Sequence, residues 1–291
     1  MYKFILLFSL LTTAHAQVAP RHPELPPEVD ISAYPVSRYF RTVPLEKAHS
    51  KRGSARFEYL NQDKISVFIW NIQKLKQKQW NDEFDSLSKG KDLILFQEAY
   101  ENDIFVEKIS SLNDFTWDFG QSFEYLMYGV KTGNMIGSNT RPLSVKVLHS
   151  PDVEPVLETP KATIAAKYPI LGSEKELLVI SIHGINFTTN GAFYRQLKQI
   201  FALIDQHKGP VIFGGDFNTH NNKRFYYLMR EANKRNLVNL DFRDSHLRKR
   251  FSGNILDHTL ARGVQVIDSY IPRNIKGSDH PPMMLDVKII P

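Results

Sequence analysis

From residue 64 onward, the chain consists of short apolar runs that are separated by turn residues. The first run, residues 64–70 (KISVFIW), is rich in β-branched and aromatic residues and therefore predicts a buried strand. Further strands are predicted at residues 92–96, 143–148, 163–166, 176–182, 211–213, 255–260, 265–270 and 284–290. A chain built from so many short strands needs sheets to bury them.

One segment has helical spacing instead. Its apolar stripe consists of Phe193, Leu197, Ile200, Phe201 and Ile204. Asn190 is its predicted cap and Gly209-Pro210 its stop, and weaker helices are predicted at 80–87 and 225–232. Many strands with few helices favour a two-sheet sandwich over a series of βαβ units. The predicted fold class is α/β: a four-layer sandwich with two mainly antiparallel β-sheets packed face to face and helices outside.

The N-terminal segment, MYKFILLFSLLTTAHA, has the features of a secretory signal peptide. Lys3 gives a positive start, an apolar run follows, and Ala14-His15-Ala16 is a cleavage signal. The run is far shorter than the roughly 20 residues of a membrane span. We therefore expect cleavage after residue 16 and a secreted protein, extracellular or periplasmic; the alternative is an N-terminal anchor or a buried strand.

Proline density separates the next segment from the rest of the chain. The six prolines are Pro20, Pro23, Pro26, Pro27, Pro35 and Pro44. Proline at this density disfavours helices and central strands. Residues 17–56 are predicted to be an extended arm on the domain surface, with a flexible linker as the alternative reading. No second hydrophobic core separates off, so residues 57–291 are predicted to form one catalytic domain.

The composition excludes several classes of protein. With 42% hydrophobic and 23% charged residues, the chain is neither disordered, collagen-like nor a polytopic membrane protein. It has no cysteine, which excludes disulfides, thiolate metal sites and cysteine nucleophiles, and suits an exported protein. The net charge is +6, and removal of the signal peptide would leave +5. This excess permits a polyanionic partner without requiring one.

Polar side chains gather where the apolar runs end or begin. The groups are Asn71, Gln97-Glu98, His183 with Asn186, Asp216-Phe217-Asn218, Asp257-His258 and Ser278-Asp279-His280. A carboxylate buried beside a strand is costly unless it is paired or binds metal. One such group is easily a structural hydrogen bond, but six at strand ends indicate an active site.

The residue types restrict the chemistry of that site. The chain has no G-x-S-x-G elbow, no phosphate-binding P-loop and no dinucleotide-binding glycine motif. Carboxylate and amide oxygens suit Mg²⁺, Mn²⁺ or Ca²⁺. Histidines beside carboxylates are general acids or bases. Together with the basic surface, these features point to metal-assisted cleavage of phosphoesters.

The ordered set of motifs resembles the endonuclease/exonuclease/phosphatase superfamily, which has the DNase I-like fold. The resemblance runs from about residue 65 to 285, and it is closest to a poorly characterised bacterial branch. It rests on the stretches WNIQK, LFQEAY, GPVIFGGDFNTH, ILDHTLARG and GSDHPP. One departure is residues 133–142 (GNMIGSNTRP), where that branch has a different small-residue run in a loop near the site.

The resemblance implies a metal site. Glu98 matches the principal metal-binding glutamate, Asn71 the amide beside it, and Asp279 a second acid on the metal side. The expected ion is Mg²⁺ or Mn²⁺, with Ca²⁺ as an alternative structural or co-activating ion. Gln97 is interpreted as a support for Glu98 rather than a ligand.

The resemblance also implies catalytic roles. Asp216 and Asn218 match the pair that positions or activates the attacking water and holds phosphate. His280 matches the essential histidine, and Asp257 the aspartate that orients it through a hydrogen bond. His183 lies where members have a His or Tyr that touches the phosphate. His258 is interpreted as structural.

Other side chains are predicted to contact substrate phosphate. Asn186 fits an accompanying amide of the family, and Lys74 and Arg250 belong to basic runs near two of the strand ends. Those runs are Lys74, Lys76 and Lys78, and Arg248-Lys249-Arg250. Either run could instead be an ordinary solvated loop.

Three functions remain open from the sequence. The first is a secreted, divalent-metal-dependent phosphodiesterase, a nuclease that hydrolyses DNA or RNA. The alternative is a metal-dependent phosphatase or a sphingomyelinase-like phosphoesterase, and the third is a catalytically inactive polyanion-binding protein. The expected partner is a nucleic acid substrate, with no stable membrane insertion and a monomeric chain.

Overall fold

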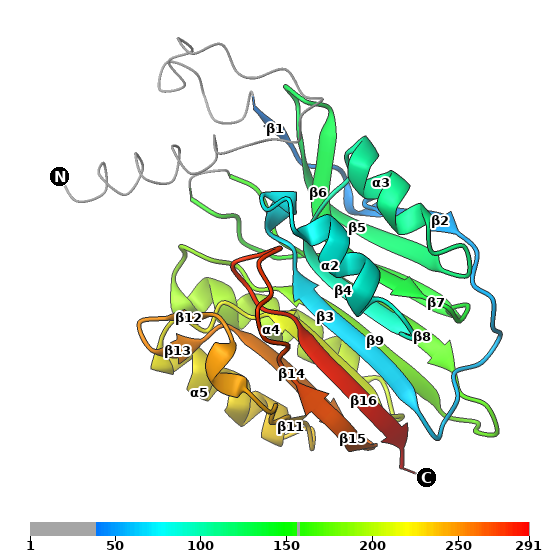
Figure 1. The fold of residues 1–291 in the computed structure, drawn as a ribbon. Coiled ribbons are helices and arrows are strands. Elements are labelled where there is room, and N and C mark those ends of the chain that lie inside the picture. Colours follow the sequence, from blue (N-terminus) through cyan, green and yellow to red (C-terminus); the bar gives the residue numbers. More distant parts are fainter. Residues whose placement is uncertain (1–38, 156–157, 291) are drawn as a thin grey trace.

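The computed structural model describes residues 39–155 and 158–290 (Figure 1). The predicted signal peptide and most of the predicted arm lie outside these described residues. Among the helices that are described, none has the length and apolar character needed to cross a bilayer.

The strands form two large sheets and one small hairpin (Figure 1). The first sheet has the order β1-β5-β6-β4-β3-β16-β15, with β2 also pairing with β5. Its strands are β1 (Phe40–Arg41), β2 (His49–Gly53), β3 (Ile65–Asn71), β4 (Leu93–Tyr100), β5 (Thr116–Tyr125), β6 (Val130–Ser138), β15 (Val264–Tyr270) and β16 (Met283–Ile289). The second sheet has the order β11-β14-β10-β9-β8-β7. Its strands are β7 (Ser144–His149), β8 (Ala162–Pro169), β9 (Glu176–His183), β10 (Val211–Asp216), β11 (Val238–Asn239) and β14 (Asp257–Arg262).

The remaining elements lie outside the two large sheets. The hairpin pairs β12 (Arg250–Phe251) with β13 (Asn254–Ile255). The α-helices are α2 (Trp80–Leu87), α3 (Asp103–Ser110), α4 (Asn190–Asp205) and α5 (Asn222–Asn233). Single 3₁₀ turns are η3 (Leu45–Lys47), η4 (Gln73–Leu75) and η5 (Ser245–Leu247).

Three apolar layers hold these elements together in the predicted sandwich. The inner faces of the two sheets bury a shared core that includes Ile69 of β3 and Ile212 of β10. The outer face of the first sheet packs against α2 and α3, and that of the second against α4 and α5. Because successive strand residues face opposite sides, β3 buries Ile69 inward and Phe68 and Trp70 outward. This two-sided burial explains why its sequence is apolar throughout.

Helix α4 shows how the sequence sets these boundaries. Its predicted stripe is buried against the second sheet. The cap, however, is Thr189 rather than Asn190: the Thr189 hydroxyl accepts a hydrogen bond from the Ala192 N–H, and Asn190 is already helical. The predicted helix was therefore right and its first residue wrong by one position.

Residues 130–138 are a central strand, which corrects the expectation of a loop at 133–142. β6 lies between β4 and β5, with antiparallel pairing to both. β5 also pairs with β1 and β2, so the described end of the predicted arm belongs to the sheet. The sheet thereby includes residues before 57, the predicted start of the catalytic domain.

Candidate active site

Three neighbouring strands of the second sheet place three polar side chains in one row. At the end of β10, Asp216 is the register partner of His183 on β9 and of Asp257 on β14. Register partners on adjacent strands lie on the same face of a sheet. The polar strand ends seen in the sequence therefore meet at one edge of the sandwich.

The first sheet adds its own strand ends to this edge. Asn71 of β3 is the register partner of Gln97 on β4. The pairing of β4 with β6 then shifts between Phe96 and Ala99, and Glu98 has a φ of 55°. Such a bulge re-aims a side chain, and strained backbone of this kind is concentrated at functional sites. It presents Glu98, which is one-fifth exposed, to the site.

His280 lies between the sheets, in the loop before β16, and pairs with Asp257. Its Nδ1 is 2.9 Å from Asp257 Oδ1 and 3.0 Å from Oδ2. Ser278 fixes the loop, because its hydroxyl donates to the Asn71 carbonyl and accepts from the His280 N–H. The Trp70 indole N–H donates to the His280 carbonyl. The pairing of Asp257 with His280, expected from the sequence, is present.

A chain of contacts links the other site residues. The Asn71 amide donates to Asp216 Oδ2 at 3.0 Å. His183 Nε2 lies 3.7 Å from that same oxygen and 3.9 Å from Glu98 Oε1. The other oxygen of Glu98 accepts from the Lys74 ammonium at 2.8 Å. The two sheets thus contribute to a single cluster.

Burial and neighbouring charges separate the protonation states in this cluster. Burial raises the pKa of Asp216 to about 7, with Asp257 adding to the rise against the opposing charge of His280. Burial alone would lower the pKa of His280, but the carboxylates of Asp257 and Asp216 outweigh it and raise that pKa to about 10. Burial, helped by Lys161, holds the pKa of His183 well below its usual value. Near neutral pH, His280 is therefore charged and His183 neutral.

Hydrogen bonds from Asn218 and Arg224 hold the loop after β10 in place. Asn218 has a φ of 52°, its N–H donates to Asp216 Oδ1, and its amide donates to the Gly184 carbonyl. The buried Arg224 donates to the carbonyls of Asn218, Ile185 and Thr188. These bonds hold the loops after β9 and β10 together, so Asn218 supports the site through its backbone as well as its side chain.

Several predicted residues have partners outside this cluster. Asp279 is more than one-third exposed and forms an ion pair with Lys249 at 2.6 Å, with no bond to Glu98 or Asn71. Arg250 is exposed and donates to the Gly253 carbonyl within the hairpin. The backbone N–H of Asn186 donates to Glu154. These three remain candidates for contacts made with substrate or metal.

The residues of the basic run Arg248-Lys249-Arg250 do not share one role. Arg248 is buried, and its guanidinium donates to the Asp257 carbonyl and the Ser245 hydroxyl. It therefore supports the backbone of Asp257 and is not free to hold phosphate. His258 is likewise internal, with Nε2 at 2.9 Å from the Thr219 hydroxyl, which agrees with a structural role.

Two charged residues near the site were not singled out from the sequence. Lys161 and Glu154 form a largely buried ion pair at 3.2 Å. The positive charge of Lys161 lowers the pKa values of both Glu98 and His183. Neither residue follows an apolar run that ends in a recognisable motif, so only the three-dimensional packing reveals them. Arg224 had no sequence signal either.

Comparison with known proteins matches residues 69–280 to the model of the endonuclease/exonuclease/phosphatase family. That range contains every residue of the cluster. The chain belongs to the endonuclease/exonuclease/phosphatase family. A relative, a UPF0294 protein of Vibrio parahaemolyticus, is 30% identical over 222 residues, which cover 76% of each chain.

Solved structures of this family share the fold. The family member from Bacteroides vulgatus superposes with a TM-score of 0.61 at 14% identity, covering 78% of this chain and 99% of that one. TDP2 of Danio rerio, determined with a single-stranded DNA product, gives a TM-score of 0.56 at 14% identity, covering 77% and 99%. Family membership makes the chain a phosphoester hydrolase in class, and members of the superfamily generally use divalent metal ions.

A divalent ion of the family type needs a charged oxygen ligand, and Glu98 supplies one. Burial would raise the pKa of Glu98, but the positive charge of Lys74, helped by that of Lys161, holds it well below its usual value, so the carboxylate is charged. The Lys74 ammonium already places a cation on that carboxylate. A single charged carboxylate with an adjacent amide suits Mg²⁺, which keeps several waters and binds substrate phosphate. Glu98 and Asn71 fit the family's ion.

Asp216, Asp257 and His280 form a second group whose ligand atoms lie within 4.8 Å of one another. Here, Nδ1 of His280 already faces the Asp257 carboxylate, which is the arrangement of an imidazole oriented by an acid. Its other nitrogen, Nε2, lies 3.9 Å from Asp216 Oδ2. We therefore interpret this group as the acid–base part of the family's site and Glu98 as its metal-binding part.

Proposed function

We propose that the protein is a divalent-metal-dependent phosphodiesterase that hydrolyses nucleic acid. The observation that carries the proposal is the Asp257–His280 pair. His280 lies close to Asp216, Asp216 to His183, and His183 to Glu98. This arrangement joins a charged imidazole, a carboxylate of near-neutral pKa and a metal-binding carboxylate. Hydrolysis of a phosphodiester by water uses all three.

Each residue has a role in the proposed reaction. Asp216, with a pKa of about 7, accepts the proton of the attacking water as the water oxygen bonds to phosphorus. The bond from phosphorus to the leaving oxygen breaks in the same displacement. His280, charged and held by Asp257, donates from Nε2 to the phosphate and stabilises its developing charge. The neutral His183 donates a hydrogen bond to another phosphate oxygen.

Glu98 and Asn71 would hold the divalent ion, which when bound supplies charge to neutralise the phosphate. Both Mg²⁺ and Mn²⁺ prefer oxygen ligands of this kind. Ca²⁺ is a further candidate, as a structural or co-activating ion. Lys74 then acts at the edge of this site, where its ammonium exchanges between Glu98 and substrate phosphate. Asp279 adds a second carboxylate from the surface.

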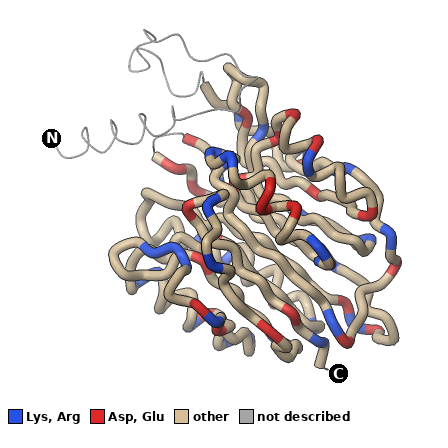
Figure 2. Tube along the Cα trace, viewed as in Figure 1, with Lys and Arg blue, Asp and Glu red and all other residues tan. Residues whose placement is uncertain are grey.

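A nucleic acid substrate is supported by charge and by one relative. The chain is basic overall, and basic positions lie at η4 and β12, at the end of the sandwich that holds the site (Figure 2). TDP2, which shares the fold, was determined with single-stranded DNA. Phosphate contacts by lysine and arginine supply most of the affinity of proteins for nucleic acid. Lipid and small-phosphate hydrolysis are the competing outcomes of the test.

The deciding experiment is hydrolysis of supercoiled plasmid with Mg²⁺ or Mn²⁺, beside a small phosphodiester and sphingomyelin. We expect cleavage of the plasmid and of the small diester, and none with EDTA. Glu98→Gln keeps the shape of the side chain but removes its charge, so it should weaken metal binding, measured by calorimetry, with little change in thermal stability. Cleavage of sphingomyelin alone, or unchanged metal affinity in Glu98→Gln, would contradict the proposal.

We also propose that the protein is exported, with cleavage after Ala16. The proposal rests on the charged start, short apolar run and small-residue cleavage signal of residues 1–16. Expression of the full chain in a bacterium should yield a mature protein that begins at Gln17, identified by intact mass, in the periplasm or medium. Full-length protein retained in the cytoplasm would refute export.

A further inference from the structure

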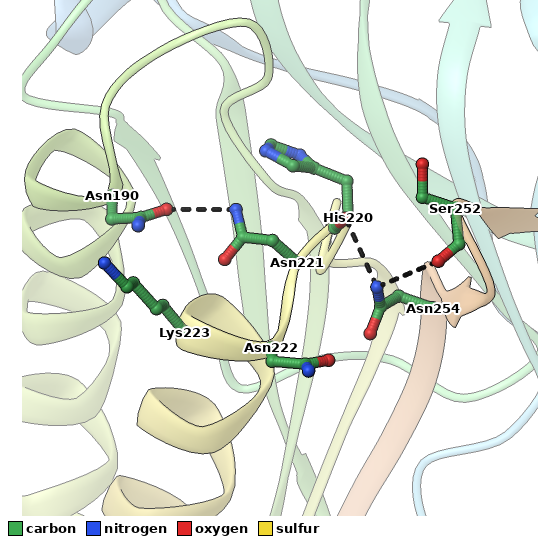
Figure 3. A pocket seen from close by; sticks show the side chains of 7 residues that line it. All are labelled: Asn190, His220, Asn221, Asn222, Lys223, Ser252 and Asn254. Carbon is green, nitrogen blue, oxygen red and sulfur yellow. Dashed lines mark hydrogen bonds between the residues drawn. The ribbon is translucent and has the colours of Figure 1, made fainter.

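A surface cavity of about 580 Å³, largely open to solvent, lies beside the proposed active site (Figure 3). The residues that line it are Asn190, His220, Asn221, Asn222, Lys223, Ser252 and Asn254. They come from the start of α4, the loop after β10, the start of α5 and the turn of the β12–β13 hairpin, and none is acidic.

Two of the lining amides, those of Asn222 and Asn254, have few hydrogen bonds within the protein. The Asn222 side chain makes no hydrogen bond among the described residues, and those of the Asn254 amide, to the carbonyls of His220 and Ser252, are 3.4 Å long. Figure 3 shows these amides and the His220 ring surrounding the cavity from different sides. Amides carry a donor and an acceptor together, which matches the edges of nucleobases and the hydroxyls of sugars.

An exposed aromatic ring lies next to one of the lining residues. The His220 ring lies 6.0 Å from the ring of Phe251, which is more than half exposed. Exposed aromatic rings are the usual surfaces on which bases stack.

Two chain segments connect the cavity to the proposed active site. His220 is two residues beyond Asn218, and Asn254 is three residues before Asp257. Backbone and side-chain bonds join these segments: the Phe217 N–H donates to the Leu256 carbonyl, and the Thr219 hydroxyl to the Ile255 carbonyl. A group in the cavity is therefore held in a fixed position relative to a phosphate at Asp216 and His280.

We propose that this cavity binds a nucleoside of the substrate, next to the scissile phosphate. The amides of Asn222 and Asn254 contact its base or sugar, the rings of His220 and Phe251 stack on the base, and Lys223 holds the adjoining phosphate. The inference rests on the proposed function and deepens it, because it selects nucleic acid over a lipid or a simple phosphoester. A lipid headgroup would leave the aromatic and amide groups without partners.

Binding without turnover provides the first test. Thymidine monophosphate, adenosine and inorganic phosphate are titrated in EDTA, with affinity measured by NMR. We expect the nucleotide and the nucleoside to bind, and His220→Ala and Asn254→Ala each to weaken binding about ten-fold. Asn222→Ala changes an asparagine at the end of α5 that lines the cavity. Its matched control is Asn233→Ala, which changes an exposed asparagine at the other end of the same helix.

The second test compares two substrates of the active enzyme: thymidine 5′-(p-nitrophenyl phosphate) and methyl p-nitrophenyl phosphate. The ratio of their kcat/KM values should fall about ten-fold in Asn222→Ala and His220→Ala, and stay at the wild-type value in Asn233→Ala. Binding of inorganic phosphate as tightly as the nucleotide, or equal ratios in all variants, would overturn the inference. If the wild type hydrolyses neither ester, the proposed function fails, and the EDTA titration still decides whether the cavity binds nucleosides.

Discussion

The Asp257 carboxylate and the His280 imidazole are buried together, and each satisfies the other. Asp257 lies at the start of β14 and His280 in the loop before β16, 23 residues later. Both ends are anchored, Asp257 through the bond from Arg248 to its carbonyl and His280 through Trp70 and Ser278. A pair held in this way fixes which imidazole nitrogen faces the substrate.

Asp257→Asn tests this pair. The amide keeps the size of the side chain but removes the charge that raises the pKa of His280, so that pKa should fall, as measured by NMR. Activity on a small diester should fall about 10²–10⁴-fold, the usual contribution of a general acid or base. The control is Asp63→Asn, which changes an exposed aspartate two residues before β3. A loss of less than about three-fold would exclude the pair from the chemistry.

The two shifted pKa values also predict how activity depends on pH. Below the Asp216 pKa of about 7, the carboxyl is protonated and accepts no proton, so kcat/KM should rise about ten-fold per pH unit up to 7. Above the His280 pKa of about 10, the imidazole loses its charge, so kcat/KM should fall. Rates measured from pH 5 to 11 should therefore give a bell-shaped profile. A maximum in acid, below pH 6, is incompatible with these assignments.

The strand-end motifs identified most of the cluster because a motif fixes where the backbone leaves a strand. A motif does not determine which partner a surface side chain contacts. Asp279 follows Ser278 in the expected motif, yet its carboxylate pairs with Lys249, 30 residues earlier. Arg248 appears in the sequence as part of a basic loop but is buried under Asp257. Such partners depend on the packing of distant segments, so the sequence could not assign them.

At the scale of elements, every strand with a continuous apolar run was predicted, whereas β5 and β6 were not. Both strands are almost wholly buried, but their sequences, TWDFGQSFEY and VKTGNMIGS, mix polar and small residues. Some of their polar groups find partners across the sandwich, as when the Asn134 amide donates to the Ser181 carbonyl, and others on a neighbouring strand, as when Asp118 pairs with His49. Periodicity cannot reveal a strand whose burial depends on such pairing.

The lack of room for a side chain at Gly137 explains why this position is a glycine, and it leads to a prediction. A Cβ there would lie 2.3 Å from the Trp117 ring of β5. Gly137→Ala should therefore lower the free energy of unfolding by about 1–3 kcal/mol, the usual cost of overpacking. Urea denaturation measures it. Gly191, in the first turn of α4, has no heavy atom within 3.4 Å of its Cβ position, so Gly191→Ala should leave stability unchanged or raise it by up to about 1 kcal/mol.

At the scale of the whole molecule, the distribution of charge predicts the response to salt. Lys74, Lys249 and Arg248 are already engaged within the protein, whereas Arg250, in the β12–β13 hairpin, and Lys223, which lines the cavity, have exposed side chains. Each neutralised phosphate adds roughly 0.7–0.9 to the slope of log K against log salt. Arg250→Gln should flatten the slope for polynucleotide binding by about that amount.

The matched control for salt is Lys175→Gln, because Lys175 is exposed just before β9, at the end of that strand opposite His183. Fluorescence anisotropy with a labelled oligonucleotide, from 50 to 200 mM NaCl, measures the affinity of each variant and hence its slope of log K against log salt. Each phosphate contact contributes about one unit to that slope. Equal slopes in wild type and Arg250→Gln would show that the hairpin does not contact the polymer.

The division of the site between two sheets has a consequence for the life of the chain. Asn71 and Glu98 come from the first sheet, His183, Asp216 and Asp257 from the second, and His280 from the loop before β16, the last strand of the first sheet. No fragment made early in synthesis contains a complete set, because His280 lies close to the C-terminal end of the sequence and the set comes together only when the two sheets dock. For a protein that is exported and cleaves nucleic acid, as we propose, this delay would protect the nucleic acids of the producing cell until the chain has left it.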